Sequence, residues 1–145
     1  MIAVVDAEER FVKWALVGMF AQQHDPDFLS NGNIMLFDNW GGRPYRKRSR
    51  IVEIDPVTQE VVWQYDGGKG DDFLGKIRGK QQVLPHGNVL VTDSQSGRVF
   101  EVTRGDSPEI VWEYYNRLPP RDGEARVGLI TLALRLGTEA ATFIN

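Results

Sequence analysis

Short apolar runs alternate with polar turns along most of the chain. The runs IVEI, VVWQY, VLVT and VFEV are rich in β-branched and aromatic residues, which favour strands. Apolar positions alternate or occur in fours, and they do not recur at the helical spacing of about 3.6 residues. The pattern therefore predicts an all-β chain built from short strands and tight turns.

The same order of strands and turns occurs more than once. Trp14, Trp63 and Trp112 are equally spaced, and each ends a similar apolar run. The segment 29–39 (LSNGNIMLFDN) also parallels the segment 84–94 (LPHGNVLVTDS). Their N-G-N and H-G-N turns place glycine between two apolar runs, which indicates antiparallel hairpins. Four short strands in each copy are typical of a β-propeller blade.

The predicted fold is a partial β-propeller with about two and a half four-stranded blades of an expected six-bladed ring. A half blade covers residues 4–16, whole blades cover residues 20–65 and 76–115, and a tail covers residues 116–145. The tryptophan on the last strand of each blade is expected to fill the layer between blades. In the tail, the run LITLALRL is compatible with a short helix or with a closing strand.

Because propellers close with about four to eight blades, we interpret the chain as a fragment of a longer protein. Self-assembly that closes the ring, for instance from three copies of a two-blade unit, is the alternative. The start of the chain lacks the basic and apolar regions of a signal peptide. Either the protein is cytoplasmic or its true N-terminus lies upstream. No stretch is apolar enough to span a bilayer.

Charge and composition narrow the range of partners. The net charge of −3 over 145 residues argues against nucleic acid or an anionic membrane as a partner. The basic run Arg43–Arg50 is interpreted as a solvated loop rather than a binding patch. The absence of cysteine excludes disulfides, thiolate metal sites and cysteine nucleophiles. No carboxylate cluster, P-loop or dinucleotide fingerprint is present, so we predict no metal and no cofactor.

Two residues of the predicted channel are candidates for chemistry. His24 falls where the first strand of a blade lines the channel, and a histidine there can act as a nucleophile, a base or a ligand. Alignment of the two blades places Arg78 beside the same channel, where a guanidinium binds sulfate or phosphate oxygens. The alternatives are a buried structural histidine and an arginine held in a salt bridge. His86 lies in a turn and is interpreted as a turn residue.

Several segments together resemble the arylsulfotransferase family of β-propellers. They are QHDPDFLSNGNIMLFDN, SRIVEIDPVTQEVVWQY and IRGKQQVLPHGNVLVTDSQSGRVFEVT, and the resemblance covers about residues 20–116. It implies a six-bladed propeller exported to the periplasm or secreted. It also implies an enzyme in which a channel histidine takes a sulfuryl group from a phenolic sulfate ester and passes it to a phenol, without a nucleotide donor.

The resemblance assigns the sulfuryl acceptor to His24. Asp25 and Asn39 match positions that flank the family's histidine, and we assign them with Arg78 to substrate binding; Asp38 matches a flanking position without a role. The family's other assisting histidines have no counterpart here and belong to blades outside this chain. The fragment alone is therefore expected to be inactive. The alternative is a propeller module that binds a small ligand or a protein without catalysis.

Overall fold

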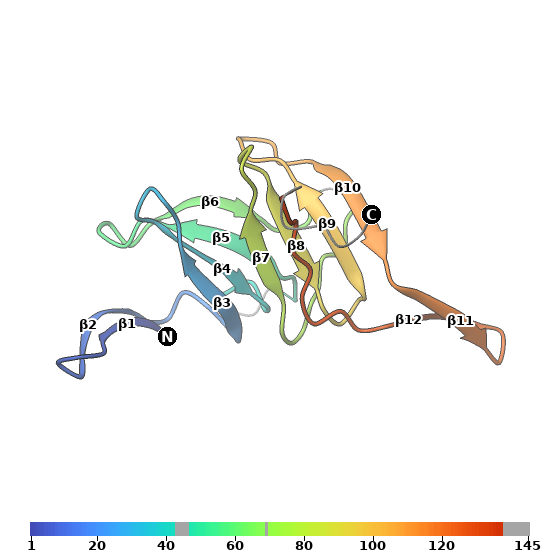
Figure 1. The fold of residues 1–145 in the computed structure, drawn as a ribbon, viewed down its shortest axis with the longest axis horizontal. Coiled ribbons are helices and arrows are strands. Elements are labelled where there is room, and N and C mark those ends of the chain that lie inside the picture. The colour runs from blue at the N-terminus through green and yellow to red at the C-terminus, as the bar shows by residue number, and fades with distance from the viewer. Residues whose placement is uncertain (43–46, 69, 138–145) are drawn as a thin grey trace.

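A computed structural model describes residues 1–42, 47–68 and 70–137, and in these residues every regular element is a strand (Figure 1). None of them forms a helix of the length and hydropathy that crossing a membrane requires. The strands are β1 (Ile2–Asp6), β2 (Phe11–Leu16), β3 (Gln23–Phe28), β4 (Ile34–Asp38), β5 (Arg50–Ile54), β6 (Val61–Tyr65), β7 (Lys80–Val83), β8 (Val89–Asp93), β9 (Arg98–Val102), β10 (Ile110–Tyr115), β11 (Arg117–Arg121) and β12 (Glu124–Val127).

Two four-stranded antiparallel sheets form the body of the molecule. Strands β3 to β6 pair in sequence order, and strands β7 to β10 do the same. We call them the first blade and the second blade. The hairpins β1–β2 and β11–β12 form separate two-stranded sheets that extend from opposite ends of the body (Figure 1). The prediction of an all-β partial propeller is confirmed.

The middle strands of each blade bury both of their faces. All five residues of β4 are buried, and so are all five of β5. Successive side chains of a strand point to opposite faces. Phe37 and Ile51 therefore pack toward the second blade, whereas Leu36 and Val52 pack toward the β1–β2 hairpin. Such continuous apolar runs follow from a strand that is covered on both sides.

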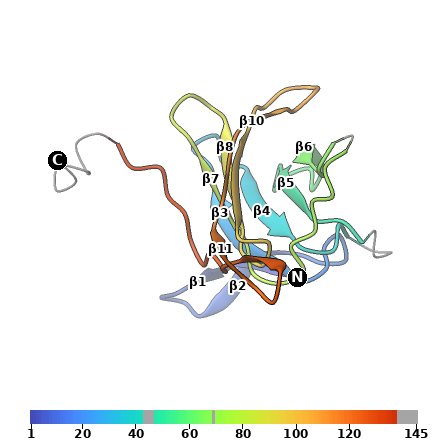
Figure 2. The same cartoon turned by 90° about the vertical axis from the view of Figure 1, so that its right-hand side faces the viewer.

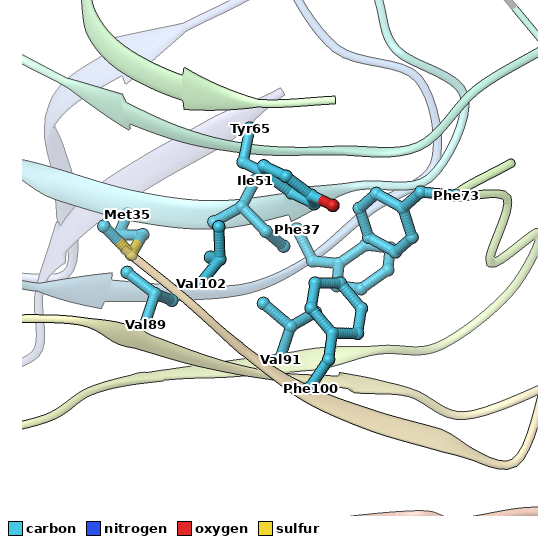
Figure 3. Close-up of a cluster of buried hydrophobic side chains, with 9 residues drawn as sticks. All are labelled: Met35, Phe37, Ile51, Tyr65, Phe73, Val89, Val91, Phe100 and Val102. Atoms are coloured by element: carbon cyan, nitrogen blue, oxygen red, sulfur yellow. The ribbon is translucent and has the colours of Figure 1, made fainter. Parts of the chain in front are cut away.

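An aromatic layer fills the space between the two blades (Figure 3). At its centre is Phe73, which comes from the connection between β6 and β7. The ring centroid of Phe73 lies 5.3 Å from that of Phe37 and 5.3 Å from that of Phe100, with interplanar angles of 70° and 85°. Edge-to-face pairs of this kind add to the apolar burial, which contributes about 1.5–3 kcal/mol for each buried phenylalanine. The connection is therefore pinned between the blades.

The three equally spaced tryptophans have different surroundings. Trp14 packs on the cluster beside the β1–β2 hairpin and donates its Nε1–H to the Pro56 carbonyl at 2.9 Å. Trp63 packs on the layer between the blades. Both agree with the expectation that a tryptophan fills an inter-blade layer. Trp112 does not, because it is 45% exposed and no further four-stranded sheet follows it among the described residues.

The interpretation of Arg43–Arg50 as a solvated loop is wrong at its C-terminal end. Arg50 is buried on β5, and its Nε donates to Asp38 Oδ2 at 2.9 Å. Its Nη2 donates to the Met19 carbonyl at 2.9 Å. A buried guanidinium needs such partners to offset its desolvation. Residues 43–46 lie outside the described residues.

The tail adopts neither of the two structures expected for the run LITLALRL. It begins with the exposed β11–β12 hairpin. Residues 129–137 then form neither a helix nor a strand, and Ile130 and Ala133 in this segment pack on the outer face of the second blade. Residues 138–145 lie outside the described residues.

Asp38 and Asp93 end the second strand of the first and second blade, but their environments differ. Asp38 Oδ1 accepts the Ala21 amide at 2.9 Å, and its other oxygen accepts Arg50. Asp93 is equally buried, yet its Oδ1 has no hydrogen-bond partner in the part of the chain that the structure describes. Burial raises the pKa of Asp93, although hydrogen bonds from Ser96 oppose the shift. Burial therefore disfavours the charged form of the Asp93 carboxyl, and ionising it costs the fold stability.

We expect Asp93→Asn to stabilise the protein near neutral pH by about 1 kcal/mol, because it removes a buried charge. A carboxyl whose folded-state pKa is raised stabilises the fold when protonated, and that contribution is lost as the pH rises through the raised pKa. The advantage of the variant should therefore shrink as the pH is lowered toward about 4. Urea unfolding at several pH values measures this difference.

Asp38→Asn is the matched control. It weakens the pairing with Arg50 and should destabilise the protein by about 1–3 kcal/mol near neutral pH. If both variants destabilised the protein, the claim that the buried charge of Asp93 is unfavourable would be wrong.

Candidate functional site

His24 lies at the start of β3 and is half-buried. Gln22, two residues before it, and Asp25, directly after it, have positive φ angles of 56° and 55°, and a bulge interrupts the pairing of β3 with β4 after His24. Bulges of this kind re-aim a side chain. His24 Nδ1 is 2.9 Å from the Gln22 carbonyl oxygen and 2.7 Å from Asn39 Oδ1.

These two contacts decide which ring nitrogen of His24 carries a proton. Both partners are oxygen acceptors, because the Asn39 amide nitrogen is engaged elsewhere, so Nδ1 must carry the proton. Nε2 of the neutral ring then holds the lone pair. Nε2 makes no hydrogen bond with any residue that the structure describes. His24 is therefore oriented through one ring nitrogen and available at the other.

Asn39 follows β4 and connects the two blades. It is fully buried, and its Nδ2 donates to the carbonyl oxygens of Gly75 and Arg78, each at 2.6 Å. Both acceptors lie in the connection that Phe73 pins between the blades. With both of its N–H groups used, the amide can turn only its oxygen toward His24. Asn39 is thus a positioning residue for the imidazole.

Arg78 reaches this site through its backbone. It has a φ of 62°, and its carbonyl accepts Asn39 while its side chain is exposed. Gly79 follows with a φ of 115°, and a Cβ there would lie 2.6 Å from the Phe37 ring, so only glycine fits. The salt bridge that was the alternative for Arg78 is absent, since its guanidinium pairs with no carboxylate in the described part of the chain.

Asp25 joins β3 to β7. Its carboxylate forms an ion pair with Lys80 and accepts the Gln81 amide at 3.3 Å, and its carbonyl accepts the Gln81 side chain. Asp25, Lys80 and Gln81 also line a groove of about 900 Å³ that continues along the hairpin turns to Arg104. His24 lies one residue before the first lining residue. Desolvation raises the pKa of Asp27 in the same groove, and the Asp25 charge adds to it.

The structure brings His24, Asn39 and the backbone of Arg78 together, and places Asp25 next to them. Sequence reasoning missed three other contributors. Lys80 and Gln81 had a signal, because the run KQQV begins a predicted strand that lines the channel. The Gln22 carbonyl had none, since a backbone oxygen bonds to His24 only through the local turn. No group of three or more His, Asp or Glu side chains in the described ranges is arranged to hold a metal.

The fold and this site define a partial β-propeller with an oriented histidine on the first strand of a blade. The sequence model of the arylsulfotransferase (ASST) family matches residues 1–117, and the chain belongs to this family. Membership implies an aryl sulfate and a phenol as substrates. No curated protein and no solved structure matches the chain.

Replacing Asn39 with alanine should change the tautomer of His24, because the Gln22 carbonyl then remains as the only acceptor for Nδ1. We expect the fraction of the Nδ1–H form to fall, and the fold to lose about 1–3 kcal/mol from the two unpaired carbonyls. The ¹⁵N chemical shifts of the imidazole report the tautomer.

His86 provides an internal control in the same spectrum, because its ring contacts Glu101 and not Asn39. Unchanged His24 nitrogen shifts in a folded Asn39→Ala protein would show that Asn39 does not orient the ring.

Proposed function

We propose that this chain carries the sulfuryl-accepting part of an arylsulfotransferase site, with His24 Nε2 as the transient acceptor. One observation carries the proposal. Nδ1 of His24 is held by two oxygen acceptors, which leaves the Nε2 lone pair free. A neutral imidazole with its proton placed at the far nitrogen is the form that attacks an electrophile.

In the first step, Nε2 attacks the sulfur of an aryl sulfate ester. A bond between nitrogen and sulfur forms, and the bond between sulfur and the phenolic oxygen breaks. The phenolate leaves with the electron pair and takes a proton from solvent. The ring then carries positive charge, which the Gln22 carbonyl and Asn39 Oδ1 stabilise by accepting the Nδ1–H.

In the second step, the oxygen of another phenol attacks the same sulfur. The bond between nitrogen and sulfur breaks, its electron pair returns to Nε2, and the phenol proton goes to solvent. Two successive displacements with a covalent intermediate predict ping-pong kinetics.

Arg78, Asp25 and Asn39 have different parts in this proposal. The guanidinium of Arg78 is exposed and pairs with no carboxylate among the described residues, so it is assigned to the sulfuryl oxygens as negative charge spreads over them. Asn39 acts through His24. Asp25 holds Lys80 beside the substrate groove.

A closed channel requires more blades than the two that the described residues complete. We propose that these come from additional chain or from other copies of the same chain, and that two blades alone do not transfer sulfate. We also propose that the protein is exported to the periplasm or secreted, as the family resemblance implies.

The test uses the protein with all the blades that close its ring, with a nitrophenyl sulfate as donor and a phenol as acceptor. We expect His24→Ala to lower the rate of nitrophenol release by at least about a hundredfold, since the nucleophile is lost. Mass spectrometry of the parent protein, quenched during turnover without acceptor, should find the added sulfuryl group on His24. His86→Asn is the control, and it should retain the parent rate.

Nitrophenol release that persists in His24→Ala would contradict the assignment of the nucleophile. Binding of the aryl sulfate by the parent protein with neither release nor labelling would instead support a non-catalytic binding module.

A further inference from the structure

The outer face of the second blade, which points away from the first blade, is covered by the protein's own chain. We call it the end face. Its apolar centre consists of Leu84, Leu90 and Val99, and Ile130 and Ala133 pack against it. Both come from residues 128–137, which we call the C-terminal segment. Figure 1 shows this segment in dark red where it crosses β8, and Figure 2 shows its course from the side.

The contact between the first and second blades includes a buried carboxylate. Glu53 of β5 accepts hydrogen bonds on Oε1 from Asn31 at 3.0 Å and Asn33 at 2.7 Å, both in the hairpin turn of the same blade. Its other oxygen pairs with Arg104, which follows β9 of the second blade. The Arg104 guanidinium also lies over the Trp63 ring, 5.4 Å from the centroid. One arginine from the next blade thus occupies a position made by a glutamate and a tryptophan.

The end face has a matching glutamate and tryptophan, and they also hold an arginine. Glu101 of β9 accepts hydrogen bonds on Oε1 from Asn88 at 2.7 Å and contacts His86 Nε2 at 2.9 Å. Its Oε2 pairs with the Arg135 guanidinium at 3.0 Å, and this guanidinium lies 5.5 Å from the centroid of the Trp112 ring. The hydrogen bonds from Asn88 and His86 lower the pKa of Glu101, so the carboxylate is charged at neutral pH.

The two arginines occupy matching positions but come from different structures. Arg104 follows a strand of a blade, whereas Arg135 belongs to a segment without regular structure. Glu53 and Glu101 occupy corresponding places in β5 and β9, and Trp63 and Trp112 do so in β6 and β10. The end face thus offers an arginine the same charged and aromatic partners that the first blade offers to Arg104 of the following blade.

We propose that the end face is a docking surface for a neighbouring blade, and that the C-terminal segment covers it by placing Arg135 where such a blade places its arginine. The segment then takes the place of a blade, and it must leave the end face before a blade of another copy of this chain can dock there.

The fit of the segment is looser than that of a blade. A hollow of about 360 Å³ remains between the segment and the end face, lined by Trp112, Leu90 and Ile130 among others. Trp112 is 45% exposed, whereas Trp63 packs on the inter-blade core. Apart from the Arg135 guanidinium, the segment is held by few polar contacts. The Gly128 amide donates to the Asn116 carbonyl, and the Arg135 carbonyl accepts from Gln82 Nε2. The amides of Ile130, Ala133 and Arg135 donate to Ser94 O, Thr92 Oγ1 and Gln82 Oε1.

Hydrogen exchange of these three amides in the full chain tests the proposal. Arg135→Ala removes the guanidinium and leaves the backbone, so we expect the three amides to exchange about tenfold faster. Amides of β4 and β5 should keep their parent rates, which shows that the blades stay folded. Arg135→Lys keeps the charge without the planar group and should give an intermediate rate. Arg104→Ala, the matched control, should leave the three amides unchanged.

Sedimentation of the same proteins tests the protective role. We expect Arg135→Ala to show a mass that rises with concentration beyond that of the parent chain and of Arg104→Ala, because the end face becomes available. Parent exchange rates in Arg135→Ala would overturn the arginine contact as the element that holds the segment. Faster exchange without any added association would overturn the role of the face as a docking surface.

Discussion

The aromatic layer between the two blades is the interaction on which the rest of the structure depends. Phe73 places the connection between β6 and β7 against Phe37 and Phe100. This puts the carbonyls of Gly75 and Arg78 within reach of Asn39, and Asn39 in turn orients His24. The geometry of the candidate nucleophile is therefore a consequence of core packing. A protein interior is close-packed, so a displaced connection would move the imidazole with it.

Polar contacts distinguish two sheets that share one strand order. In both blades the hairpin turn binds a glutamate, and this glutamate pairs with an arginine from outside the blade. They differ at the end of the second strand, where Asp38 pairs with Arg50 but Asp93 has an unpartnered oxygen because Arg98 is turned toward Asp71. Buried charges need complete sets of partners. Blades with the same fold can therefore differ in how their stability depends on pH.

Family membership indicates the class of reaction, and the site geometry indicates which residue takes part in it. The match over residues 1–117 places the chain among arylsulfotransferases, whereas the hydrogen bonds of His24 supply a chemical reason for choosing this residue. The groove beside it runs along β3 and β7, the first strands of the two blades. In a propeller these strands surround the axis, so a site there is completed by residues of several blades. Function in this fold thus depends on how blades are joined.

The sequence by itself determined the local structure: alternating apolar residues predicted the strands, glycine turns predicted the hairpins, and the spacing of the copies placed His24 on a first strand. The strand and turn signals act within a few residues, since side-chain alternation is a property of one strand, and the spacing only compares copies of the same local pattern. Only the tertiary structure decided that Asn39 orients His24, that Arg50 is buried, that Trp112 is exposed and that Arg135 covers the end face. These features join segments far apart in the chain, and chain folding brings them together through packing that no local pattern encodes.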